Sequence, residues 1–255
     1  MIEIQNLHFS YGGASSLQLP ELTLSDGTLT ALVGENGSGK TTLLRLIMGE
    51  LFPREGAIRI DGLETSRVKK AELATRLSYF PQGRPTPDMS ALEVTALGRY
   101  PHSRSRLLAS KEDRKLAYRA LTSVGVEDFA DRHMKSLSFG ERQRVYLAMQ
   151  LVQEAQNCLF DEPTNFMDAS AKFHMLNTLS DLREQGRCVL CVIHDLTLAM
   201  RYADRILVLK EGTLLADGTP DELYESGAID RAFGIRLCRS VENGERFYGI
   251  LPEPK

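Results

Sequence analysis

The chain has 255 residues, of which 42% are hydrophobic and 25% are charged, and its formal net charge is -3. These values are ordinary for a soluble globular protein of one or two domains. A nucleic-acid binder usually carries a basic excess, so the charge argues against that class. No apolar run approaches the roughly 18 residues that a membrane span needs, and the N-terminus lacks a signal-peptide core. We therefore expect a cytoplasmic protein that binds no nucleic acid.

The first third of the chain is predicted to combine an antiparallel β layer with one strand–loop–helix unit. The expected strands are residues 1–11, 17–24, 28–34, 56–62 and 77–80, with a turn at Gly12 and Gly13. Residues 40–51 carry helical spacing and meet Gly49 and Pro53 near their end. The strand before this helix ends in a glycine loop.

From residue 90 to about 124 the pattern is helical, and a polar, basic connection at residues 101–106 divides it. Ser110 followed by Asp113 predicts a capping box, with Asp in the place of Glu or Gln. The remaining chain alternates between the two kinds of element. We expect helices at 140–154, 169–185 and 196–202, strands at 157–163 and 188–193, hairpins at 205–218 and 241–255, and a helix capped by Thr219 with Pro220 at its first position. Such alternation predicts a parallel sheet covered by helices.

The four cysteines are Cys158, Cys188, Cys191 and Cys238. Cys188 and Cys191 have the CxxC spacing of redox and zinc sites, but they lie within CVLCVI, an apolar run typical of a buried strand. Side chains of a strand alternate between its two faces, so these two thiols should point in opposite directions. We expect them to pack as small hydrophobes in the core.

Residues 34–42, GENGSGKTT, match the GxxxxGK[ST] pattern in full, between a strand and a helix. A triphosphate needs many donors around a compact anion, and glycines let the backbone N–H groups wrap closely around it. We expect Lys40 to reach the β and γ phosphates and Thr41 to give its hydroxyl to Mg²⁺. The expected ATP-binding residues of this phosphate loop are Gly34, Glu35, Asn36, Gly37, Ser38, Gly39, Lys40, Thr41 and Thr42.

Two acidic residues end the strand NCLFDE at 157–162. Asp161 is expected to hold Mg²⁺ directly or through water, and Glu162 is placed to accept a proton from an attacking water. Two acids before Pro163 could instead be helix N-terminal residues. Their position after a complete phosphate loop favours the catalytic interpretation.

Further motifs resemble those of ABC-type ATPases. LSFGERQRV at residues 137–145 resembles the family's signature segment, and DEPTNFMD at 161–168 resembles its Walker B motif running into the D-loop. VIHD places His194 like the switch histidine, YFPQ places Gln82 like the Q-loop glutamine, and Tyr11 stands where an aromatic stacks on adenine. Taken singly, Tyr11 could be a strand aromatic, Gln82 a loop residue, Ser138 a helix cap and His194 a strand end. Their common order carries the resemblance, which covers nearly the whole chain.

The resemblance implies an α/β fold: a P-loop NTPase core with a parallel sheet, an N-terminal antiparallel β layer and a helical subdomain. One domain would span 1–255, with the core and β subdomain at 1–89 and 133–255 and the helical subdomain at 90–132. It implies a head-to-tail homodimer with two ATPs between the copies. Ser138, Gly140 and Glu141 would contact the partner's ATP, Glu162, His194 and Gln82 would act in hydrolysis, and Thr41, Gln82 and Asp161 would hold Mg²⁺. Asp168 would link the two sites.

One position departs from the family pattern. Members usually read LSGGQ or LSGGE, whereas Phe139 stands here in the place of the first glycine. A positive φ at that position would cost a phenylalanine roughly 1 kcal/mol or more. Gly140 is kept, so close approach of the backbone to a ligand remains possible. We expect an active ATPase, the alternative being an ATP-binding regulatory subunit with weak turnover. The change to NFMD in the D-loop keeps Asp168, and we expect it to preserve function.

The resemblance also implies a transporter subunit. The stretch between Lys40 and Ser138 is too short for the coiled coils of DNA-repair members, and only one ATPase unit is present. EVTALGRYPHSR at 93–104 resembles importer ATPases for iron–siderophore, haem and cobalamin uptake, although an ordinary amphipathic helix with a basic loop is the alternative. Permease subunits would contact the region 82–104 at the cytoplasmic face of the membrane, with an extracytoplasmic substrate-binding protein acting indirectly. Another substrate class stays open, because the ATPase does not touch the cargo.

Overall fold

The computed structural model describes residues 1–12, 16–102, 109–242 and 245–252. The strands are β1 (Ile2–Ser10), β2 (Ser16–Leu19), β3 (Leu22–Leu24), β4 (Thr28–Val33), β5 (Glu55–Ile60), β6 (Leu63–Glu64), β7 (Leu77–Phe80), β8 (Asn157–Asp161), β9 (Cys188–Val192), β10 (Arg205–Lys210), β11 (Thr213–Gly218), β12 (Ile235–Glu242) and β13 (Glu245–Pro252). The turn expected at Gly12 and Gly13 lies partly outside the described residues.

The α-helices are α1 (Lys40–Ile47), α2 (Lys70–Leu73), α3 (Ala91–Ala96), α4 (Lys111–Ser123), α5 (Phe139–Leu151), α6 (Ala169–Glu184), α7 (Leu196–Tyr202), α8 (Pro220–Glu225) and α9 (Ala228–Phe233). Short 3-10 helices cover Leu97–His102, Glu127–Phe129 and Met134–Ser136. The predicted capping box of Ser110 and Asp113 begins α4, and Thr219 caps α8 with Pro220 at its start, as predicted.

One sheet runs through the described part of the molecule in the order β6-β5-β1-β2-β11-β10-β4-β9-β8-β7, and β3 pairs with β1 at its side. Strands β10, β4, β9, β8 and β7 are parallel to one another, and β11 pairs with β10 in the antiparallel sense. Strand β1 is antiparallel to β2, β3 and β5. The predicted α/β fold with an N-terminal antiparallel layer is therefore confirmed.

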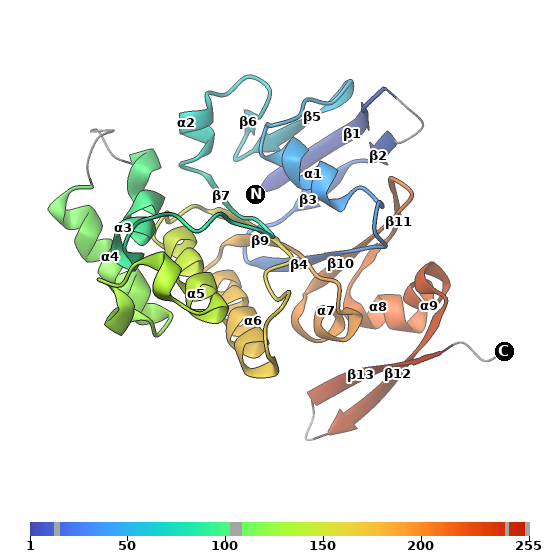
Figure 1. The fold of residues 1–255 in the computed structure, drawn as a ribbon. Coiled ribbons are helices and arrows are strands. Elements are labelled where there is room, and N and C mark those ends of the chain that lie inside the picture. Colours follow the sequence, from blue (N-terminus) through green and yellow to red (C-terminus); the bar gives the residue numbers. More distant parts are fainter. Residues whose placement is uncertain (13–15, 103–108, 243–244, 253–255) are drawn as a thin grey trace.

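The sheet separates two hydrophobic cores. Helix α1 packs with the antiparallel strands in one core, which takes Leu190 and Val192 of β9. The other core contains residues of α5, α6 and α7 together with Val189 and Cys191 of the same strand. Figure 1 shows α1 between the antiparallel strands at the top and the parallel strands in the middle. Both faces of the parallel strands are covered, which explains their continuous apolar runs.

Strand β9 separates its two cysteines as predicted, because Cys188 belongs to one core and Cys191 to the other. Cys158, Cys188 and Cys191 are buried, and burial raises the pKa of each thiol. Among the described residues, no group of three or more His, Cys, Asp or Glu side chains is arranged to hold a metal ion. The core interpretation of the CxxC pair is therefore confirmed.

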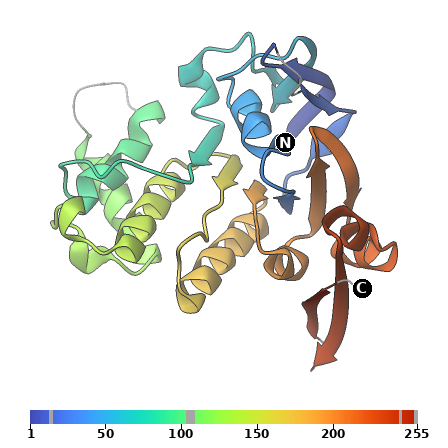
Figure 2. The same ribbon diagram turned by 45° about the vertical axis from the view of Figure 1, so that its right-hand side comes forward.

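Helices α3, α4 and α5 pack together at one side of the sheet, on the left of Figures 1 and 2. The segment that contains α3 and α4 begins and ends at one place: Ala91 N donates to Arg132 O at 2.9 Å, and Met134 N donates to Met89 O at 2.9 Å. The domain boundaries at 90 and 132 stay a prediction. The polar connection at 101–106 falls partly outside the described residues.

The C-terminal hairpin is longer than predicted. Strand β12 begins at Ile235, not at Val241, and it pairs with β13 over eight positions. Helix α9, which the sequence pattern did not reveal, precedes it, and β13 packs on α7 at the lower right of Figure 1. The polar residues of β12 hid this strand, because much of it faces solvent. No helix in the described part of the chain is long and apolar enough to cross a membrane.

Candidate nucleotide site

The phosphate loop joins the end of β4 to the start of α1. A Cβ at Gly34 would lie 2.3 Å from the carbonyl oxygen of Leu209 and 2.6 Å from Ser38 Oγ, so only glycine fits there. Gly39, with φ 104°, is the residue before α1 and turns the chain into the helix. The turn after β10 packs on the loop, where Gly212 N donates to Ser38 O at 3.1 Å. The segment after β10, the strand next to β4 in the sheet, thus holds the loop in place.

Lys40 is buried at the first position of α1. Its Nζ donates to the carbonyl oxygens of Gly34 at 2.8 Å and Glu35 at 2.9 Å, so the ammonium lies inside the curve of the loop. Burial lowers the pKa of Lys40, and the nearby carboxylates of Glu162 and Asp161 act in the opposite sense. The arrangement presents one desolvated cation and the N-terminus of α1 to the same space, which suits an anion.

Asp161 is the last residue of β8, and its side chain is buried. Tyr79 of the neighbouring β7 donates its hydroxyl to Asp161 Oδ2 at 3.1 Å. Burial raises the pKa of Asp161 and also that of Tyr79. A carboxylate in this environment gains from a cation, because a positive charge offsets its lost hydration.

Glu162 follows with φ 52°, a left-handed backbone that few glutamates adopt. Gln82 Nε2 and Asn165 Nδ2 both donate to Glu162 Oε2, and His194 Nε2 hydrogen-bonds to Glu162 Oε1. These partners come from the segment after β7, the loop after β8 and the loop after β9. Adjacent parallel strands end at one edge of a sheet, which is why segments distant in sequence meet on one carboxylate.

Tyr11 lies at the end of β1, 59% exposed, with its ring edge-on to Phe9 at a centroid distance of 4.8 Å. A hollow of about 300 Å³ lies beside it. Its lining residues are Phe9, Tyr11, Ser16, Leu17, Gly37, Gly39, Thr42, Glu211 and Gly212. The aromatic face and the phosphate loop therefore border the same space.

The signature segment (residues 137–145) lies elsewhere. Ser138 accepts a hydrogen bond from Glu141 N, and Glu141 Oε2 accepts one from Ser138 N at 2.7 Å, so the two form a capping box at the start of α5. Ser138, Gly140 and Glu141 line a hollow of about 780 Å³ shared with Asp168, and no residue of the phosphate loop lines it. Asp168 itself caps α6, accepting from Ala171 N at 2.8 Å. One chain thus brings together Lys40, Asp161, Glu162, Gln82 and His194, but not the signature segment.

Two residues in the site were not identified from the sequence. Asn165 binds Glu162 from three positions further along the chain, and an amide at that spacing in the short loop DEPTN was a usable signal. Tyr79 reaches Asp161 only because β7 and β8 are parallel, with Tyr79 opposite Leu159. Nothing in the sequence gives that register.

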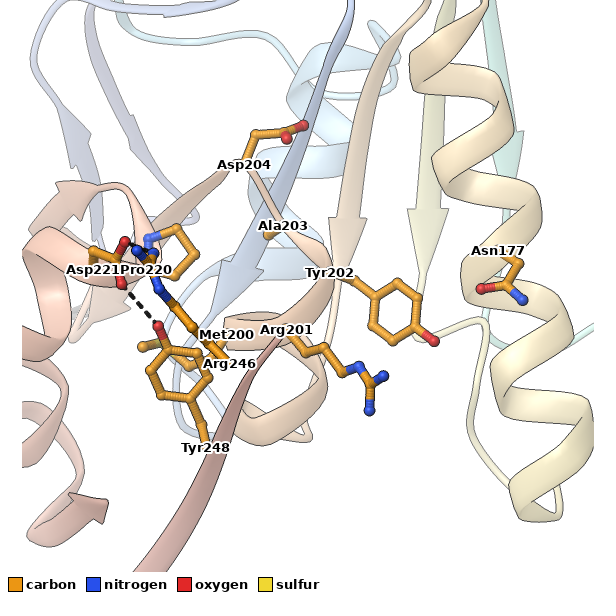
Figure 3. A pocket seen from close by; sticks show the side chains of 10 residues that line it. All are labelled: Asn177, Met200, Arg201, Tyr202, Ala203, Asp204, Pro220, Asp221, Arg246 and Tyr248. Atoms are coloured by element: carbon orange, nitrogen blue, oxygen red, sulfur yellow. Dashed lines mark hydrogen bonds and ion pairs between the residues drawn. The ribbon is translucent and has the colours of Figure 1, made fainter. Parts of the chain in front are cut away.

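A third hollow, of about 650 Å³, lies between α6, α7, the start of α8 and β13 (Figure 3). Three of its polar groups bond to one another, as Asp221 accepts from Arg246 and from Tyr248 Oη at 3.0 Å. Arg201 extends along its wall between Tyr202 and Met200. None of the predicted site residues lines this hollow.

Comparisons with known proteins agree with this architecture. A family model described as "ABC transporter" matches residues 17–165. The ferric enterobactin transport ATP-binding protein FepC of Escherichia coli K12 is 36% identical over 94% of this chain and 89% of its own. The hemin import ATP-binding protein HmuV of Rhodopseudomonas palustris BisA53 is 36% identical over 99% of this chain and 94% of its own.

Among solved structures, the dimeric ATP-binding cassette MJ0796, in a post-hydrolysis state bound to ADP and Pi, superimposes with a TM-score of 0.76 at 28% identity. It covers 86% of this chain and 99% of its own. The family match spans more than half of the chain, and both relatives align over nearly all of it. The chain therefore belongs to the ABC transporter family and is an ATP-binding, ATP-hydrolysing member of it.

Proposed function

We propose that the chain is the ATPase subunit of an importer of iron complexes, siderophore-bound or as haem, and that its site acts through the predicted residues. The observation that carries the site is the convergence of Gln82, Asn165 and His194 on Glu162, one residue from the buried Asp161. A carboxylate held on three sides is oriented before substrate arrives, which is what a general base requires.

The loop geometry supports triphosphate binding. The adenine would stack on Tyr11, and residues 34–42 would surround the phosphates. Lys40 Nζ, now on two loop carbonyls, would exchange them for phosphate oxygens, which are stronger partners for an ammonium. Ser38 Oγ is buried and has no hydrogen-bond partner within the described residues, and such an atom favours a ligand at this loop.

Thr41, Gln82 and Asp161 are the proposed residues around Mg²⁺. They offer a hydroxyl, an amide and a carboxylate oxygen, the hard donors that this ion prefers, and Mg²⁺ needs only one or two protein ligands besides phosphates and water. The raised pKa of Asp161 fits this proposal because a dication would offset the cost of its burial. Bound Mg²⁺ would neutralise charge on the β and γ phosphates.

In hydrolysis, Glu162 would orient the attacking water and take its proton. Gln82 and His194 would stabilise the γ-phosphate and the attacking water. His194 Nε2 lies on Glu162 Oε1, so it is close enough to share this proton. Tyr79 and Asn165 would position Asp161 and Glu162 respectively.

The second half of the site would come from another copy, arranged head to tail. A Cβ at Gly140 would meet no atom within 4 Å, and its φ is not positive. Nothing within the described part of this chain therefore requires glycine there, and close approach by an outside ligand is the remaining reason. Ser138, Gly140, Glu141 and the start of α5 would face the partner's γ-phosphate, and Asp168 would connect the two sites.

The backbone at Phe139 supports full turnover. Phe139 is the first residue of α5 and is absent from the residues with positive φ, so its side chain causes no backbone strain. The strain that would have favoured a weak regulatory subunit does not arise. We expect that Phe139→Gly does not raise ATP turnover. An inactive parent that glycine rescues would contradict this proposal.

For partners, we propose integral-membrane permease subunits that contact the region 82–104 at the cytoplasmic face of the membrane, with an extracytoplasmic binding protein delivering the cargo. The names of the two relatives, which cite ferric enterobactin and hemin, support an iron complex over cobalamin. Helix α3, which lies in this region, packs with α4 and α5 at one side of the sheet (Figure 2).

Uptake assays in a strain lacking this chain test the cargo. Labelled ferric siderophore, haem and cobalamin would be supplied separately, with the wild-type chain or Glu162→Gln restored. We expect the wild-type chain alone to restore uptake of an iron complex. Restoration of cobalamin uptake only, or of none of the three, would reject the proposed cargo, and co-purification would identify the permease.

A further inference from the structure

Two exposed aromatic residues meet beside the proposed interface. Phe139, at the first position of α5, and Phe166, in the D-loop (residues 163–168), pack edge to face, with ring centroids 6.4 Å apart and an interplanar angle of 89°. Phe166 is 87% exposed and Phe139 is 41% exposed. We call them the aromatic pair. They join the signature segment to the loop that follows Glu162.

The loop that carries Phe166 is held at both ends. At its start, Asn165 N donates to Glu162 O at 3.2 Å and its amide binds the Glu162 carboxylate. At its end, Met167 packs against the core and Asp168 caps α6. Phe166 lies between these anchors with its ring exposed.

The backbone at Phe166 carries strain. Its φ of 60° is left-handed, which is rare for a bulky residue. Such conformations are costly, persist only where the surrounding structure holds them, and cluster at functional sites. Within the described residues, Phe139 is the only aromatic ring recorded in contact with it. Because the ring is 87% exposed, it buries little apolar surface within one chain, and its contact with Phe139 is small compensation for the strain.

We propose that the aromatic pair packs against a second copy of this chain and strengthens the ATP-bound dimer. This inference rests on the head-to-tail dimer of the proposed function. Both residues flank groups assigned to that interface: Phe139 lies between Ser138 and Gly140, and Phe166 lies two residues before Asp168. In a two-fold dimer each copy presents the same patch, so the pair acts twice. Large exposed rings at the centre of an interface commonly dominate its binding energy.

The pair also links two events within one chain. Phe139 is part of α5, and Phe166 lies in the same loop as Glu162, a few residues further along the chain. A partner that presses on both rings would fix the signature segment relative to the loop that holds Glu162. Hydrolysis would then depend on the contact of these rings with the second copy, in addition to the ATP bound between the two copies.

The test measures dimerisation in the Glu162→Gln background, in which bound ATP is retained. Sedimentation equilibrium with Mg-ATP would give the dimer Kd of that chain and of the same chain with Phe166→Ala, Phe139→Ala or both. We expect Phe166→Ala to raise the dimer Kd about tenfold or more and Phe139→Ala to raise it less. The double variant should show a smaller loss than the sum of the two, since the rings touch.

Phe52→Ala is the matched control. Phe52 is 55% exposed between α1 and β5, outside the proposed interface, and its loss should leave the dimer Kd unchanged. Binding of a fluorescent ATP analogue to monomer should be equal in all variants, because neither ring of the pair lines the hollow beside Tyr11. Equal unfolding midpoints would exclude misfolding as the cause.

The outcomes are separable. If Glu162→Gln forms no dimer with Mg-ATP, the proposed function itself fails. If that dimer forms and Phe166→Ala leaves its Kd within twofold, the head-to-tail site stands and the aromatic pair has no role. A tighter dimer on removal of Phe139 would likewise overturn the inference, because the ring would then obstruct closure.

Discussion

The phosphate-loop region and the signature segment differ in how far one chain completes them. Around Lys40 the site is enclosed: the cation, Asp161 and Glu162 have partners from β7 and from the segments that follow β4, β7, β8 and β9. The signature segment is a capped helix start at the surface, where Gly140 faces open space and Phe139 is exposed. One region is organised within the single chain, whereas we propose that the other becomes a site only against a second copy.

This difference explains why the same residue types do different work in the two regions. Glu162 has a strained backbone and a carboxylate held by other side chains. Glu141 sits in an unstrained helix and holds its own N-cap. Strain and cross-strand partners mark the residue proposed for chemistry, and local hydrogen bonds mark the residue that first stabilises the fold.

The largest effect is expected at the enclosed half. Glu162→Gln should lower kcat by about 10²–10⁴-fold, because it removes the proposed base, and should leave ATP affinity unchanged. Steady-state ATPase and nucleotide-binding assays check this. Glu154→Gln, a surface glutamate that also has positive φ, is the control and should keep full activity. Undiminished turnover of Glu162→Gln would remove Glu162 from the base role.

Loss of the buried cation comes next. Lys40→Ala should weaken ATP binding about ten- to hundredfold, the range expected from a charge-assisted hydrogen bond of about 1.5–3 kcal/mol. Lys210→Ala is the control and should leave ATP affinity unchanged. Lys210 Nζ also donates to a backbone carbonyl, that of Ala232 at 3.2 Å, but it lies away from the phosphate loop. Calorimetric titration with ATP would separate the two. Equal affinities would mean that the loop binds phosphate without its lysine.

The exposed half can be tested with two equivalent caps. Ser138 and Ser110 each begin a helix of 13 residues with a capping box. Alanine at either should cost about 1 kcal/mol of stability. Only Ser138→Ala should also lower turnover, by about tenfold, the loss of one hydrogen bond to a charged group. Urea unfolding and ATPase assays of both variants check this. Equal turnover would make Ser138 a cap alone.

The smallest expected effect is a loss of folding stability at low pH. Hydrogen bonds from the backbone of Ser138 and Thr219 lower the pKa of Glu141 and Glu222. A lowered folded-state pKa contributes stability that is present above the unfolded pKa and is lost as pH falls through the folded one. Unfolding free energy should therefore drop below about pH 4. In the nucleotide-free chain, Glu141→Gln and Glu222→Gln should each weaken this dependence equally, as measured by urea unfolding from pH 3 to 7.

A larger acid effect for Glu141 than for Glu222 would contradict the description of the signature segment as only a capped helix start in the single chain. It would show that Glu141 has a further partner there. The two variants need no nucleotide, so the result does not depend on turnover.

Local patterns predicted most elements well. The loop at residues 34–42, helix α1 and the caps of α4 and α8 follow from neighbours in sequence, because glycine conformation and helix capping act over a few residues. The hairpin of β12 and β13 was underestimated and α9 was missed, since short, half-exposed elements give weak periodicity. Tyr79 was missed for another reason: its partner is 82 positions away.

By itself, the sequence determined the phosphate loop, the order of the family's motifs and the burial of the CxxC pair. Each depends on residue type and short spacing. Only the tertiary structure decided that Gln82, Asn165 and His194 meet on Glu162, that Phe139 is helical and unstrained, and that its ring contacts Phe166. Strand register and helix packing fix these positions, and both arise from contacts between segments that are far apart in the sequence.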